Sequence, residues 1–225
     1  MKRALRAATA LSTTILFLVP GAVLAQSDYD WSGFYAGFTL GGAKSSSSLD
    51  FDYSSLDFPV PPTNSFSGGG STLGANAGYN WQNGNLLVGI EADINTLAFT
   101  NDLNGPGFTA QEQLHALLST RARLGVAFDQ FLFYGTAGVA AGQASIMTDV
   151  GKGDPVSSAG IVTGTVVGAG VEYAVSDNVS VQISTKTYNL SPLTTVGDDG
   201  KGPSPYTATY TPRPMVFEAG LNVHF

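Results

Sequence analysis

Residues 86–95 read Leu-Leu-Val-Gly-Ile-Glu-Ala-Asp-Ile-Asn, and this stretch decides the fold. Its side chains are alternately apolar and either small or polar. The apolar set is Leu86, Val88, Ile90, Ala92 and Ile94, and the opposite set includes Gly89, Glu91, Asp93 and Asn95. Because successive side chains of a β-strand point to opposite faces, the stretch predicts a strand with one apolar face and one face that carries carboxylates.

A second stretch, residues 118–128, alternates in the same way but carries bases in place of acids. Leu118, Ala122, Leu124, Val126 and Phe128 share one face, opposite Ser119, Arg121, Arg123 and Gly125. Opposite charges on adjacent strands attract one another when they face the same side. The sequence therefore predicts that Glu91 and Asp93 pair with Arg121 and Arg123.

Strand-like alternation recurs in six further segments, which are residues 31–42, 72–81, 131–142, 167–173, 179–186 and 217–225. Short breaks at 82–85, 129–130 and 176–178 alternate with long polar stretches at about 44–70, 96–113, 143–160 and 189–212. This order predicts an all-β fold, an eight-stranded antiparallel up-and-down transmembrane β-barrel with periplasmic termini and long external loops. The residues expected to face lipid include Val88, Ile90, Leu124, Val126, Leu221 and Val223.

A secreted β-sandwich is the main alternative, because its strands alternate as well. A sandwich buries its apolar faces in a core and leaves its charged faces in water. Here the charges share a face with many small residues, which suits a narrow lumen, while the continuous apolar face suits lipid. Closure into a barrel also removes the exposed edge strands that an open sheet presents.

The first 25 residues have the features of a secretory signal peptide. Basic residues at 2, 3 and 6 precede an apolar stretch that ends in Val23-Leu24-Ala25, which predicts cleavage after Ala25 and a barrel domain over residues 26–225. Without those three bases, seven basic residues remain against 17 acidic ones, a formal charge of −10. This charge argues against nucleic acid as a partner, and the absence of cysteine excludes thiolate chemistry.

Five motifs carry a resemblance to a known family. They are WSGFYAG at 31–37, VGIEAD at 88–93, RARLGVAFD at 121–129, YGTAGVA at 134–140 and GAGVEY at 168–173. The chain resembles the porin-family outer-membrane β-barrel proteins of alphaproteobacteria, the 25- and 31-kilodalton surface-protein type that is related to opacity proteins and the OmpA barrel. The resemblance implies placement in the outer membrane of a Gram-negative cell. It also implies that the terminal Phe225 is the aromatic signal that the barrel-assembly machinery reads.

The expected site is a lumenal ion-pair network. By register, the inward ionisable residues are Glu91, Asp93, Glu172 and Glu218 against Arg121, Arg123 and Lys186, with His224 near the periplasmic end. An eight-stranded barrel is just wide enough to be filled by side chains, so buried charges must be paired. The family tends to carry an inward Arg and Glu on the seventh strand, where this chain has Gln182 and Ser184.

The function expected from these features is structural. The protein should support envelope integrity and make surface contacts through its external loops, with outer-membrane lipids, lipopolysaccharide and a host or phage surface partner as candidate partners. A narrow pore and a haemin-type surface receptor are the alternatives. Catalysis is not expected, although His115 and Ser119 are predicted to face the same side of one strand; no cofactor or metal site is expected either.

Overall fold

The computed structural model describes residues 29–53, 63–98, 100–105, 108–149, 155–198 and 205–225. Within these ranges almost every residue lies in a β-strand. The strands are β1 (Gly33–Tyr53), β2 (Thr63–Asn83), β3 (Leu86–Ala98), β4 (Thr100–Gly105), β5 (Phe108–Phe128), β6 (Phe131–Asp149), β7 (Val156–Ser176), β8 (Val179–Leu190), β9 (Leu193–Asp198), β10 (Pro205–Thr211) and β11 (Pro214–His224). The described residues include no helix long and apolar enough to cross a membrane.

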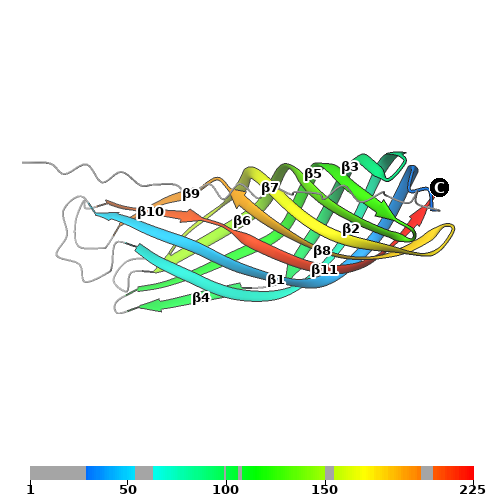
Figure 1. The fold of residues 1–225 in the computed structure, drawn as a ribbon. Coiled ribbons are helices and arrows are strands. Elements are labelled where there is room, and N and C mark those ends of the chain that lie inside the picture. The colour runs from blue at the N-terminus through cyan, green and yellow to red at the C-terminus, as the bar shows by residue number, and fades with distance from the viewer. Residues whose placement is uncertain (1–28, 54–62, 99, 106–107, 150–154, 199–204) are drawn as a thin grey trace, which may run out of the picture.

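Eight of these strands close into a ring in the order β1-β2-β3-β5-β6-β7-β8-β11, and β11 pairs again with β1. Each pairing is antiparallel, and the ring forms an elongated barrel (Figure 1). The eight-stranded antiparallel barrel predicted from the sequence is therefore confirmed. The start of β1 and the C-terminus lie at the same end, as expected.

Two of the short connections are tight turns that need unusual backbone geometry. Gly84, between β2 and β3, has a φ of 61°, and Asp129, between β5 and β6, has a φ of 49°. Glycine adopts positive φ at no steric cost, and aspartate tolerates it better than most residues. These turns mark the end of the barrel that we call the lower end, which also carries the C-terminus.

The predicted long loops are largely wrong, because the strands continue through most of them. β1 runs to Tyr53, β2 begins at Thr63, β6 runs to Asp149, and β9 and β10 lie within 189–212. The abundance of Ser, Asp, Pro and Gly predicts loops, but apolar residues occupy alternate positions in these stretches. Leu49 and Phe51, for example, are buried between exposed or half-buried neighbours. Residues 54–62, 106–107, 150–154 and 199–204 lie outside the described residues.

The outward face changes chemistry along the barrel. In the lower part it is an apolar belt; exposed members include Phe38, Leu40, Val88, Ile90, Leu124, Phe217, Leu221 and Val223. Beyond the belt, the segments 43–53, 63–72, 96–98, 100–105, 108–117, 142–149, 155–165, 187–198 and 205–215 form what we call the rim. Outward side chains of the rim are mostly Ser, Thr, Asn, Gln and Asp, although Ile161 and Val196 are also exposed.

The inward face changes in the opposite sense. Behind the belt it carries most of the buried charged residues, whereas inside the rim, apart from Glu112, it is mainly an apolar core that includes Leu49, Leu114, Ile146, Tyr206 and Tyr210. Burial, together with the nearby Glu112 carboxylate, raises the pKa of Tyr210 above its ordinary value, so its phenol stays protonated. The rim is thus built like a water-soluble β-barrel placed on top of a lipid-facing one.

The rim has a seam between β9 and β7 that strand pairing does not close, and β4 likewise pairs with β5 alone and not with β2. β9 pairs with β10 alone, so its other edge lies along β7 without a ladder of hydrogen bonds. Pro192, just before β9, has no backbone N–H to donate. At the base of the seam the Ser191 N–H donates to the Thr163 carbonyl at 2.8 Å, and Leu193 packs beside Gly160.

Candidate functional site

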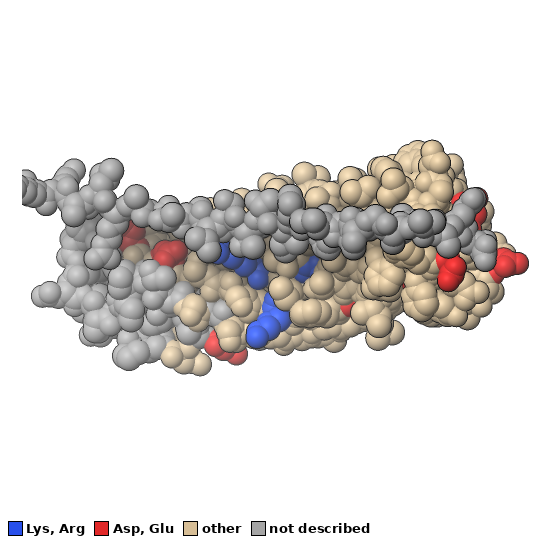
Figure 2. Space-filling model, viewed as in Figure 1, with Lys and Arg blue, Asp and Glu red and all other residues tan. Residues whose placement is uncertain are grey.

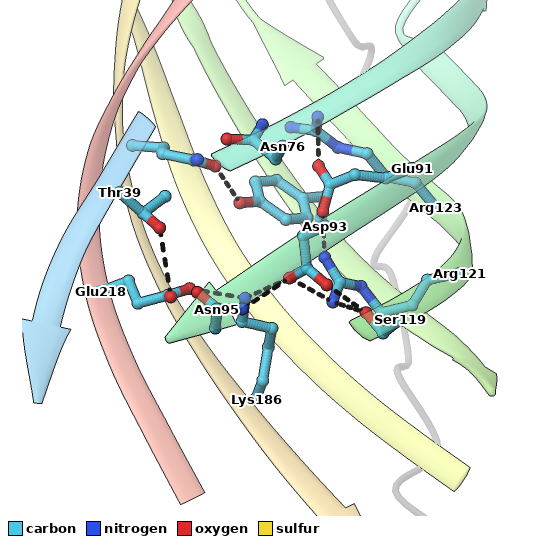
Figure 3. A network of polar contacts seen from close by, with 12 residues as sticks. Thr39, Asn76, Glu91, Asp93, Asn95, Ser119, Arg121, Arg123, Lys186 and Glu218 are labelled. Atoms are coloured by element: carbon cyan, nitrogen blue, oxygen red, sulfur yellow. Dashed lines mark hydrogen bonds and ion pairs between the residues drawn. The ribbon is translucent and has the colours of Figure 1, made fainter. Parts of the chain in front are cut away.

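Asp93, on β3, is the centre of the polar network in the lumen (Figure 3). Its carboxylate accepts a hydrogen bond from Arg121 Nη1 at 2.9 Å and forms an ion pair with Lys186 from the opposite wall of the barrel. Ser119 and Asn95 also donate to it. Lys186 in turn lies 2.6 Å from Glu218, whose other oxygen accepts from Thr39.

Arg123, on β5, organises a second part of the network nearer the lower end. Its guanidinium pairs with Glu172 across β6 and lies 3.6 Å from Glu91. It also stacks over the ring of Tyr134, with its central carbon 3.8 Å from the ring centroid. The Glu172 carboxylate accepts a hydrogen bond from Asn222 at 2.6 Å, so both charges are buried with several partners.

These contacts cross the lumen as well as lining it. Lys186 on β8 and Asp93 on β3 belong to strands that are not neighbours in the ring, and Asn76 donates to Asn222 across β1 at 3.0 Å. One space among Glu91, Arg121 and Lys186 has a volume of only about 10 Å³, near the minimum that holds one water molecule. Side chains therefore fill the lumen at this level.

A plug of apolar side chains lies below the network, at the lower end. Trp31, which precedes β1, is completely buried against Leu87, Leu132 and Ala174. Its backbone N–H donates to Gln82 Oε1 at 2.8 Å. Because Trp31 comes from outside the strands and enters the barrel end, the segment before β1 closes the lumen from below.

The structure brings together all seven residues that the sequence placed in the network. Glu91, Asp93, Arg121, Arg123, Glu172, Lys186 and Glu218 all point into the lumen and are almost fully buried. Arg121 contacts both acids of β3, forming an ion pair with Glu91 as well as with Asp93. His224 lies 3.3 Å from Glu172 at the lower edge of the network.

Two tyrosines of the network were missed. Tyr35 donates to Glu91 at 2.6 Å, and Tyr134 donates to Gln182 at 2.9 Å while it stacks on Arg123. Tyr35 lies on the same face of the first strand as Gly37 and Thr39, two positions apart along the chain. That face is the small or polar one, so the alternation could have placed Tyr35 inside the barrel. Tyr134 follows Phe131, Leu132 and Phe133, which are all apolar, so alternation alone does not show which of these side chains face inward.

The predicted juxtaposition of His115 and Ser119 is wrong. The pairing of β5 with β6 shifts register between Leu114 and Ala116, a β-bulge that adds one residue at His115. Such a bulge reverses the parity of the strand on one side of it. His115 is therefore exposed on the outer face, whereas Ser119 is buried in the lumen beside Asp93.

The terminal Phe225 lies at the lower end, outside the lumen. Its side chain is 79% exposed, while its backbone N–H donates to the Phe34 carbonyl at 2.9 Å and so completes the pairing of the last strand with the first. The aromatic ring is accessible at the edge of the apolar belt. Its role as an assembly signal remains a proposal.

Comparison with known proteins agrees with this architecture. Residues 13–225 match a family model described as "Outer membrane protein beta-barrel domain". The chain belongs to this family. Together with the apolar belt, the match identifies it as an outer-membrane β-barrel protein.

The chain is similar to two outer-membrane proteins of other bacteria. The chain is 30% identical to a 22 kDa outer membrane protein of Rhizobium leguminosarum over 68% of its own length and 61% of that relative. It is 29% identical to a 31 kDa outer-membrane immunogenic protein of Brucella melitensis, over 78% of each chain. The crystal structure of OprG from Pseudomonas aeruginosa has the same fold, with a TM-score of 0.59 and 14% identity over 86% of this chain and 96% of OprG.

Proposed function

We propose that the protein is a structural component of the outer membrane that supports envelope integrity and presents its rim to partners outside the cell. One observation carries this proposal: side chains occupy the lumen in the network, the plug and the rim core, while the outward face of the rim is polar. A filled interior leaves the outer surface as the part that can interact. The name of the Brucella relatives, outer-membrane immunogenic proteins, supports a surface position.

The proposal does not include catalysis. A nucleophile needs a base within hydrogen-bond reach, and Ser119 and His115 lie on opposite faces of β5. Ser180 lies 3.0 Å from His224, but both are buried beside Glu172, where the fold leaves no room for a substrate. We assign these groups to the packing of the lumen.

Envelope support is tested with a deletion strain. Loss of the protein should increase sensitivity to sodium dodecyl sulphate, and the wild-type chain should restore resistance. If the deletion strain were as resistant to sodium dodecyl sulphate as the wild type, the structural role would be contradicted.

Surface presentation is tested with single cysteines, which the natural chain lacks. Asp52→Cys, in the rim, should react with a membrane-impermeant maleimide on intact cells, while Ala92→Cys, in the belt, should not. Antibodies raised against the folded barrel should bind intact cells, and substitution of outward rim residues should reduce that binding. Absence of labelling at Asp52 would overturn the surface assignment.

A further inference from the structure

The basic residues of the described chain divide sharply between inside and outside. Five lie in the described ranges; Arg121, Arg123 and Lys186 point into the lumen, and Lys44 and Arg213 point outward. In Figure 2 the blue side chains on the visible face lie near one another around the middle of the molecule, whereas the red ones lie mostly toward its ends. The two outward bases stand out on a protein with a large excess of acidic residues.

Lys44, on β1, and Arg213, in the short link between β10 and β11, are close neighbours. Lys44 lies opposite Met215, and the Ser46 N–H donates to the Arg213 carbonyl at 3.4 Å, so Arg213 lies opposite Ser46. Such diagonal positions on one face of a sheet are about 7–8 Å apart, within reach of long side chains. Neither residue forms an ion pair with another part of the described chain.

Their level on the barrel is as informative as their proximity. Both lie where the outward face changes from apolar to polar. Along β1 the outward positions below Lys44 are Gly42 and then Leu40, and the one above is Ser46. Below Arg213 lie Met215 and Phe217, and above it lies Thr211. Beside Lys44 on β2 lies Gly69, which has no side chain to cover it. The transition from an apolar belt to a polar surface is the level of lipid headgroups.

We propose that Lys44 and Arg213 bind the phosphate group of an outer-leaflet glycolipid, whose acyl chains lie against the belt beneath them. Arginine and lysine are the side chains that proteins use to hold phosphate, and Arg supplies a planar pair of donors. Phe38, Leu40 and Phe217 are more than half exposed directly below, which gives acyl chains a surface to contact. A free phosphate would gain only the two exposed charges, so the geometry favours a lipid.

The test uses the purified full-length barrel in detergent, with bound lipid counted by native mass spectrometry. The probe is diphosphoryl lipid A, the phosphate-bearing anchor of lipopolysaccharide. A basic side chain near an anionic surface contributes a factor of about five, so Lys44→Gln or Arg213→Gln should weaken retention about fivefold and the double variant roughly thirtyfold. The charge-retaining pair Lys44→Arg and Arg213→Lys should bind within about twofold of wild type.

Thr187→Gln, an outward substitution on β8, is the matched control and should leave retention unchanged. The heat-dependent electrophoretic mobility of every variant verifies that the barrel is folded. Wild-type retention of lipid A by the double glutamine variant would overturn the proposal. Equal retention of a phosphate-free lipid would also overturn it, and displacement of lipid A by equimolar inorganic phosphate would assign the site to free phosphate instead.

Discussion

At the scale of single residues, Arg123 is the side chain whose loss should be felt most. It is almost completely buried, pairs with Glu172 and stacks on Tyr134. Removing one partner of a buried ion pair leaves an uncompensated charge, which costs about 3–5 kcal/mol. Arg123→Ala should therefore lower the free energy of unfolding in urea by that amount.

A double-mutant cycle controls this experiment. Adding Glu172→Gln to Arg123→Ala should recover part of the loss, because no unpaired carboxylate then remains in the lumen. Thr187→Ala, on the outer face, should have an effect below about 0.5 kcal/mol. If Arg123→Ala left the urea midpoint and slope unchanged, the pairing would not contribute to stability.

The two tryptophans provide a test of the plug. Trp31 is buried at the lower end of the lumen, whereas Trp81 is 54% exposed on the belt. Lipids with brominated acyl chains quench fluorophores that contact them. In vesicles of such lipids, the Trp31→Phe variant, which retains Trp81, should be strongly quenched, and the Trp81→Phe variant should keep most of its emission. Equal quenching of the two variants would place Trp31 outside the lumen.

The alternation of inward and outward side chains along each strand determines which of these residues the sequence could predict. Parity alone placed the seven network residues inside, because one apolar and one polar face alternate cleanly around them. It failed at His115, since nothing in the local composition indicates the β-bulge. The partners across the lumen, such as Lys186 and Asp93, depend on the curvature of the closed barrel, which no single strand encodes.

At the scale of elements, the strands are longer than the sequence indicated. The hydroxyl-rich stretches satisfied the criteria for loops, yet their alternate residues are apolar and pack in the rim core. A polar strand that faces water and a polar loop share a composition. The strand differs from the loop only in having an apolar residue at every second position. This alternation is hard to detect where Ala, Thr and Gly occupy many of the inward positions.

The division into belt and rim predicts different tolerance of charge on the same face. Ile90→Arg lies in the belt and should destabilise the barrel in vesicles by about 2–4 kcal/mol, the effect of arginine near the bilayer midplane. Thr194→Arg lies on the outward face of β9 in the rim and should change stability by less than about 0.5 kcal/mol. Equal effects at both sites, measured by urea titration, would contradict the boundary.

The rim core predicts that the upper part of the barrel unfolds separately when its packing is weakened. Leu49 is fully buried there, and Leu→Ala substitutions in cores cost about 2–5 kcal/mol. Leu49→Ala should make the rim sensitive to proteinase K on intact cells. Ser48→Ala, its neighbour, should remain resistant.

The lower barrel of the Leu49→Ala variant should keep its heat-dependent mobility, because its strands pair without the rim. If the variant lost both its heat-dependent mobility and the protease resistance of the rim, belt and rim would fold as one cooperative unit. Full protease resistance of the variant would show that Leu49 does not hold the rim together.

At the scale of the whole molecule, the inside and outside exchange polarity along one barrel. Apolar side chains face outward in the belt and inward in the rim, while charged ones face inward behind the belt. One continuous barrel wall, extended in the rim by β4, β9 and β10, thus satisfies two solvents, lipid below and water above. The exchange needs no change in the strand order, because the strands alternate on both sides of the β-bulge at His115 and the identity of their two faces changes.

The central claim is that side chains fill the lumen, so that the protein acts through its surface. Planar bilayers test it most directly. The purified monomer should give no steady conductance of the size that a wide porin shows, because eight strands enclose only enough space for side chains. A reproducible pore that admits sugars would contradict a filled lumen and assign the protein to transport.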